Sequence, residues 1–404
     1  MTSRAQVNKE PIACATDFEK LRQRRRRTLF FRRLVVLAIV AGLIYSSQFV
    51  NTFLVEHQLP TRVTNFFGQI GGPGFPVRMP AGNLEQVRAL GSDIAVINGA
   101  NLHLYSRSGR ELLSAQRIGQ GATVLTAGSR MLIYTFAGQE LRVYFQNRRL
   151  FEGEHDSPIR TAALGARGNY AIVSSTMQFR SQLTVFNDSF EQQFQWNSSE
   201  LVTLAALCPG GSQVAVGSID TRGGVFFSGV TIFALDREAP LSSLDFHNQL
   251  ILGMEYISDG RIAVITDHGL RVIEASSGRV LGSYDITGDV AFSRLGDGLT
   301  LLLSETPEDR TQTAILFGVR GQELGRADIP LAVRDMQVGN TGVYILSAGG
   351  IKVFDHAMNE RGKLEQVGIE RILLAGDVLY YFVYGEIRVF ELTADEYQPY
   401  ESYI

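Results

Sequence analysis

The stretch ILGMEYISDGRIAVITDHGLRVIEASSGRVLGSYDI (Ile251–Ile286) decides the fold. It holds four short runs of apolar and β-branched residues, and the turns between them are rich in Gly, Asp and Ser. Such runs and turns are typical of four consecutive antiparallel strands. A single four-stranded sheet cannot bury both of its faces, so the stretch predicts a unit that packs against further copies of itself.

Similar units recur along the chain and begin near residues 83, 122, 159, 201, 249, 289, 331 and 369. Four strands in each roughly forty-residue unit are typical of β-propeller blades, which bury their faces against one another in a ring. The sequence therefore predicts an all-β, eight-bladed β-propeller over residues 83–404. A seven-bladed ring and other β architectures, such as a β-sandwich pair or a β-helix, remain alternatives.

The eighth unit lacks a clear fourth strand, so the closure of the ring needs a strand from elsewhere. The short stretch FPVRM (Phe75–Met79) precedes the first unit, and we expect it to supply the outer strand of the last blade. The alternative donor is the Tyr-rich tail Tyr397–Ile404. Apart from that strand, residues 56–82 are expected to form a linker, because their Gly and Pro residues interrupt regular structure.

An uncharged apolar segment, Leu34–Val55, precedes the linker. As a helix it would span about 30 Å, the thickness of a bilayer core, so it predicts one transmembrane helix. Basic residues crowd its N-terminal side: Arg24, Arg25, Arg26, Arg27, Arg32 and Arg33. By the positive-inside rule, residues 1–33 form a cytoplasmic tail and the propeller lies outside the cytoplasm. A cleaved signal peptide and a buried core helix are the alternatives.

The same arginine cluster could be interpreted as a nucleic-acid patch, but topology and attraction to anionic lipid account for it. We therefore expect the lipid bilayer as a partner and no nucleic acid. The chain contains only two cysteines, which excludes a disulfide scaffold and a thiolate zinc cluster. The motifs G-x-S-x-G, H-E-x-x-H, G-x-x-x-x-G-K-[ST] and C-x-x-C are absent from the sequence. We expect no metal, no cofactor and no catalytic residue.

The candidate ligand-binding residues are arginines on the first strand of four units, because that strand lines the central channel of a propeller. They are Arg88, Arg160, Arg334 and Arg371. Guanidinium groups that converge on one funnel can hold a carboxylate, a phosphate or a sugar acid. The nearby acidic residues Glu85, Asp335 and Glu370 could instead neutralise these arginines in a structural network.

The layout of basic tail, single span and outer propeller resembles a family of unknown function from Gram-positive bacteria. The resemblance covers essentially the whole chain and rests on repeats such as DHGLRVIEASSGRVLGSYDI (Asp267–Ile286). The repeats are also similar to those of pyrroloquinoline-quinone-type and WD40-type propellers, through SGREL (Ser108–Leu112), SGRVL (Ser277–Leu281) and RGQEL (Arg320–Leu324). Quinoproteins of that kind carry a Trp docking motif in each blade. This chain has a single Trp, Trp196, so the resemblance implies no quinone cofactor.

Together these features predict a non-catalytic protein of the cell membrane with a cytoplasmic N-terminus. Its extracytoplasmic propeller would act as a protein-binding or scaffold module for a partner in the cell envelope. One alternative is a sensor that binds a small anionic ligand in the propeller channel. Another is an enzyme of unrecognised type, because a propeller site can be assembled from distant loops that no motif reveals.

Overall fold

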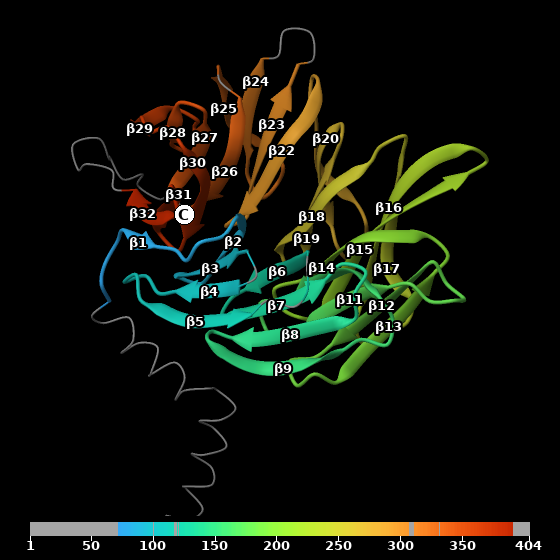
Figure 1. Cartoon of the computed structure of the whole chain (residues 1–404). Helices are drawn as coiled ribbons and strands as arrows, with labels where there is room; N and C mark the ends of the chain where they lie inside the picture. Colours follow the sequence, from blue (N-terminus) through green and yellow to red (C-terminus); the bar gives the residue numbers. More distant parts are fainter. Residues whose placement is uncertain are drawn as a thin grey trace, which may run out of the picture. The chain divides into compact units, whose positions relative to one another are not determined.

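The computed structural model describes residues 72–390, apart from 100, 117–118, 120, 307–310 and 331. These residues form strands β1 to β32 in eight four-stranded antiparallel sheets (Figure 1). The eight-bladed propeller is therefore confirmed, and the seven-bladed alternative is wrong. The predicted cytoplasmic tail and transmembrane helix lie outside the described residues. Within residues 72–390 as described, no helix is long and apolar enough to span a bilayer.

The strands follow one another in sequence order within the first seven blades. Blades 1 and 2 contain β2 (Leu84–Leu90), β3 (Asp93–Asn98), β4 (Asn101–Tyr105), β5 (Glu111–Gln116), β6 (Ala122–Ala127), β7 (Arg130–Thr135), β8 (Glu140–Phe145) and β9 (Arg148–Glu154). Blades 3 and 4 contain β10 (Ile159–Leu164), β11 (Tyr170–Ser174), β12 (Ser181–Phe186), β13 (Gln192–Ser198), β14 (Leu201–Leu207), β15 (Gln213–Arg222), β16 (Val225–Ala234) and β17 (Pro240–His247).

The second half of the ring repeats this order. Blades 5 and 6 contain β18 (Ile251–Ser258), β19 (Arg261–Thr266), β20 (Gly269–Glu274), β21 (Val280–Asp285), β22 (Asp289–Gly296), β23 (Leu299–Glu305), β24 (Gln312–Phe317) and β25 (Glu323–Ile329). Blades 7 and 8 contain β26 (Val333–Gly339), β27 (Gly342–Ser347), β28 (Gly350–Phe354), β29 (Glu360–Leu364), β30 (Ile369–Ala375), β31 (Val378–Val383), β32 (Glu386–Phe390) and β1 (Val77–Arg78).

The hydrophobic core lies between neighbouring blades, as the alternation of side chains along β19 shows. Val264 belongs to a cluster that includes Val230 of blade 4, whereas Ala263 and Ile265 pack in a cluster with Phe317 of blade 6. Successive side chains of a strand point to opposite faces of its sheet. Both faces of β19 are therefore buried, which is why its sequence is apolar almost throughout and does not alternate with polar residues.

The ring is closed by β1, which pairs antiparallel with β32 through Val77↔Ile387 and Arg78↔Glu386. The order of this sheet is β1-β32-β31-β30, so β1 is the outer strand of blade 8. Its position is the one that the sequence analysis assigned to Phe75–Met79. The ring of Phe75 packs 5.1 Å from that of Tyr380 and anchors the strand in the core. The alternative donor, Tyr397–Ile404, lies outside the described residues.

The propeller has two faces, and each face carries a different set of turns between the strands. Because the strands of each blade are antiparallel, the turns between second and third strands lie on the same face as the connections between blades. We call this the connection face, and the other the opposite face. The described chain begins on the opposite face, where the Gly74 N–H donates a hydrogen bond of 2.9 Å to the Ser108 carbonyl in the β4–β5 turn. It also ends on the opposite face, at the end of β32.

Candidate functional site

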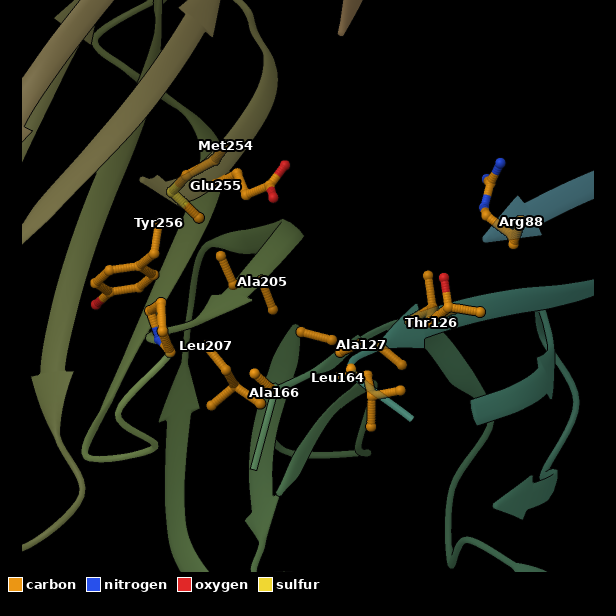
Figure 2. A pocket seen from close by; sticks show the side chains of 16 residues that line it. Arg88, Thr126, Ala127, Leu164, Ala166, Ala205, Leu207, Met254, Glu255 and Tyr256 are labelled. Carbon is orange, nitrogen blue, oxygen red and sulfur yellow. The ribbon is translucent and has the colours of Figure 1, made fainter. Parts of the chain in front are cut away.

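A cavity of about 440 Å³ occupies the channel. Its walls come from the first strands of blades 1 to 5 and the turns that follow (Figure 2). The wall residues are Arg88, Leu125, Thr126, Ala127, Gly128, Ala162, Ala163, Leu164, Ala166, Ala205, Ala206, Leu207, Pro209, Met254, Glu255 and Tyr256. The small alanine side chains of blades 2 to 4 leave the space open and give the surface between the two charged side chains an apolar part.

Arg88 on β2 forms the cationic wall of the cavity. Its guanidinium is half-buried, and Nη1 donates a hydrogen bond of 3.1 Å to the Val87 carbonyl. Burial lowers the pKa of Arg88, and the positive charge of Arg294 lowers it further, while Asp335 acts in the opposite direction. An arginine side chain still keeps its proton in proteins, so this wall carries a fixed positive charge.

Asp335 links the blades next to this wall. Its carboxylate is almost fully buried and accepts hydrogen bonds from Arg294 Nη2 (3.1 Å), from its neighbour Met336 N–H (2.9 Å) and from Ile372 N–H (3.1 Å). Arg294 also donates through Nε to the Met336 carbonyl at 3.0 Å and packs over the ring of Phe292. Two guanidinium groups, those of Arg88 and Arg294, thus share one carboxylate, which leaves an excess positive charge.

Glu255 on β18 forms the opposite wall, because blades 1 and 5 face each other across an eight-bladed ring. Its carboxylate is exposed to the space of the channel, yet the surrounding protein raises its pKa by desolvation. Among the described residues it has no hydrogen-bond or ion-pair partner. Figure 2 shows Glu255 and Arg88 on opposite sides of the cavity, with Ala205, Ala127 and Leu164 between them.

Replacement of Glu255 by glutamine is expected to stabilise the propeller at neutral pH. The raised pKa means that the folded state holds a proton more tightly than the unfolded state, whose pKa is about 4.3. The stability of the propeller therefore falls as pH rises from the unfolded-state pKa through the folded-state pKa. Above both pKa values the full cost of burying the charged carboxylate is present. The variant removes the penalty, so its melting temperature should exceed that of the wild type at neutral pH and match it below about pH 4.

Thermal unfolding as a function of pH checks this expectation. Glu370→Gln is the matched control, since Glu370 is an exposed carboxylate on the first strand of blade 8 and does not line the cavity. Its melting temperature at neutral pH should equal that of the wild type. If Glu255→Gln also followed the wild type at every pH, the carboxylate would carry no desolvation penalty.

The four arginines predicted from the sequence do not occupy equivalent places, and only Arg88 lines the cavity. Arg160 Nη1 lies 3.5 Å from the Arg180 carbonyl, and Arg371 Nη1 donates to the Glu370 carbonyl at 3.1 Å. Arg334 is exposed and sits at a β-bulge, next to Asp335. The proposed joint site of Arg88, Arg334 and Arg371 therefore stays a prediction, and the cavity offers a different set of partners for Arg88.

The sequence analysis missed Arg294 and Glu255. A β-bulge lies three residues before each of the three charged side chains. The bulge falls at Glu85 before Arg88, at Leu252 before Glu255 and at Ala291 before Arg294. A β-bulge adds one residue to its strand. The side chains that follow the bulge therefore face the opposite direction from the one that strict alternation would give them. An alignment of the first strands on their bulges would have brought these three residues together, but the bulges leave no clear signal in the sequence.

The described residues contain no group of three or more His, Cys, Asp or Glu side chains that could hold a metal ion. The observed fold and cavity define a closed eight-bladed β-propeller with a charged, partly apolar channel. The sequence matches a family of unknown function (DUF5711) over residues 79–384, and the chain belongs to that family. No match is found among the curated proteins.

Several solved structures are similar in fold. A chain of the crystal structure of the mitotic checkpoint complex is 9% identical, with a TM-score of 0.45, covering 80% of this chain and 95% of that one. Kluyveromyces lactis Hsv2 is 11% identical, with a TM-score of 0.45, and the match covers 68% of this chain and 95% of that one. BamB from Moraxella catarrhalis is 10% identical, with a TM-score of 0.39, and the match covers 68% of this chain and 98% of that one.

Proposed function

We propose that this protein is a non-catalytic, membrane-anchored module whose propeller lies outside the cytoplasm and binds a protein of the cell envelope. The apolar segment Leu34–Val55 and the arginines before it support the anchor and its orientation. The observation that carries the binding role is the uneven distribution of exposed apolar side chains over the two faces of the propeller.

Ten large hydrophobic side chains are exposed among the described residues, and seven of them lie on the connection face. Five belong to the adjacent blades 2 to 5, and we call them the docking surface: Phe136, Met177, Phe179, Val225 and Leu252. Val367 and Tyr384 lie on the same face beside blade 8, while Val280, Val319 and Leu324 lie on the opposite face. Scattered exposed hydrophobic residues are ordinary, but their concentration on one face favours an interaction site.

The composition of the docking surface also favours a protein partner. Phe and Met are enriched in the centres of protein interfaces, and both types occur here in neighbouring loops. The β15–β16 hairpin extends beyond its neighbours β14 and β17, with Val225 at its tip beside the Gly223–Gly224 turn (Figure 1). The ion pair Arg180–Asp220 (3.1 Å) braces this hairpin against the adjacent loop of blade 3. Neither end of the described chain lies on this face.

Capture of envelope proteins by the full-length, detergent-solubilised chain tests the proposal. Val225→Asp places a charge in the docking surface, and Val319→Asp is the matched control, because Val225 borders a hairpin turn, Val319 lies in one, and the two are 48% and 41% exposed. A true partner should be recovered by the wild type and by Val319→Asp, and at least about tenfold less by Val225→Asp. If no protein shows this dependence, the docking surface has no role in binding.

A further inference from the structure

We propose that the channel cavity binds a small zwitterion, with its anionic group on Arg88 and its cationic group on Glu255. A short peptide with free ends is a ligand of this class. The site is separate from the docking surface and does not depend on it, because the cavity is lined by first strands whereas the docking surface is formed mainly by outer loops.

The anionic group is attracted by the excess positive charge around Arg88. The carboxylate of Asp335 is already engaged by Arg294 and by two backbone N–H groups, so it neutralises only one of the two guanidinium groups. A guanidinium carries five N–H donors, and the hydrogen bond of Arg88 to the Val87 carbonyl uses one of its NH₂ groups. A carboxylate bound here would gain charge-assisted hydrogen bonds that are stronger than those between neutral groups.

The cationic group is attracted by Glu255, whose carboxylate faces the cavity from blade 5 without a partner among the described residues. Arg88 does not serve as that partner, since the two side chains lie on opposite sides of the cavity (Figure 2). An ammonium group at this wall would compensate the carboxylate that desolvation now disfavours. Retention of a carboxylate at a cost in stability is typical of a binding site.

Apolar side chains form part of the surface between the two charges, among them Leu164, Ala205, Leu207 and Met254. A volume of about 440 Å³ suits a small ligand, and most such sites combine an apolar lining with a few fixed polar groups. The ligand class therefore has one charge of each sign at its ends and an apolar body between them. A ligand with a single charge would leave either Arg88 or Glu255 uncompensated.

Isothermal titration of the full chain in detergent with ω-amino acids, from aminobutyrate to aminooctanoate, tests the proposal. Hexanoate and hexylamine are the matched ligands with one charge each. At least one ω-amino acid should bind about tenfold or more tightly than both of them. If no ω-amino acid binds, or if the singly charged ligands bind equally well, the proposal is wrong.

Variants assign each end of the ligand. Arg88→Met should bind the best ω-amino acid no better than hexylamine, and Glu255→Gln should bind it no better than hexanoate. Arg334→Gln, which alters an exposed arginine outside the cavity, should bind as the wild type does. Ala205→Phe should abolish binding by filling the cavity without a change of charge. Wild-type affinity in Arg88→Met and Glu255→Gln would overturn the proposal.

Discussion

Replacement of Asp335 by alanine is expected to lower the free energy of unfolding of the propeller by about 3–5 kcal/mol. The side chain is 3% exposed and joins three blades through Arg294, Met336 and Ile372. Its removal leaves the buried N–H of Ile372 without an acceptor and leaves two arginines without their shared carboxylate. An unsatisfied buried donor and an uncompensated charge are both costly.

Denaturant unfolding of the solubilised chain measures this effect. Asp377→Ala is the control, because Asp377 has a side chain that is 65% exposed and pairs with Arg107 at 3.0 Å on the surface. Exposed ion pairs contribute about 0–1 kcal/mol, so this variant should unfold almost as the wild type does. Equal stability of Asp335→Ala and Asp377→Ala would show that the link between blades 6, 7 and 8 is not what stabilises this part of the ring.

Replacement of Val77 by aspartate is expected to destabilise the propeller by about 2–4 kcal/mol and to open the ring. Val77 packs on the core cluster that contains Tyr380, Phe382 and Ile387. A carboxylate in this cluster would weaken the attachment of β1, which is only two residues long. Blade 8 would then expose the edge of β32, and free strand edges promote aggregation.

The neighbouring residue on the same strand gives a matched control. The Arg78 side chain is 86% exposed and lies 3.6 Å from Glu386, so Arg78→Gln should change stability by less than about 0.5 kcal/mol. Thermal unfolding and size-exclusion chromatography distinguish the two variants. If Val77→Asp remained as stable and as monodisperse as Arg78→Gln, closure by β1 would not stabilise the propeller.

The sequence predicted the repeat well because its signals are local. The first strands of the blades begin within about two residues of the expected positions, for example at Leu84, Ile159 and Val333. Apolar runs of strand length and turns with Gly or Asp suffice for such a prediction. The missing fourth strand of the last unit pointed to Phe75–Met79, which contains the outer strand β1.

The candidate site was only partly predictable. The presence of Arg88 on a first strand was clear from the sequence, but its neighbours Arg294 and Asp335 come from blades 6 and 7. Which side chains face the channel depends on the β-bulges of the first strands, and a shift by one residue reverses the direction of a side chain. The docking surface was unpredictable for a similar reason, because loops of four different blades form it.

Protease digestion of intact spheroplasts that produce the full chain with a C-terminal epitope tag tests whether an N-terminal anchor holds the binding propeller outside the cytoplasm. We expect protease to release or degrade the tagged propeller without lysis and to leave a short N-terminal fragment rich in arginine. A tagged, full-length chain that resists protease in intact spheroplasts but is digested after lysis would contradict this expectation.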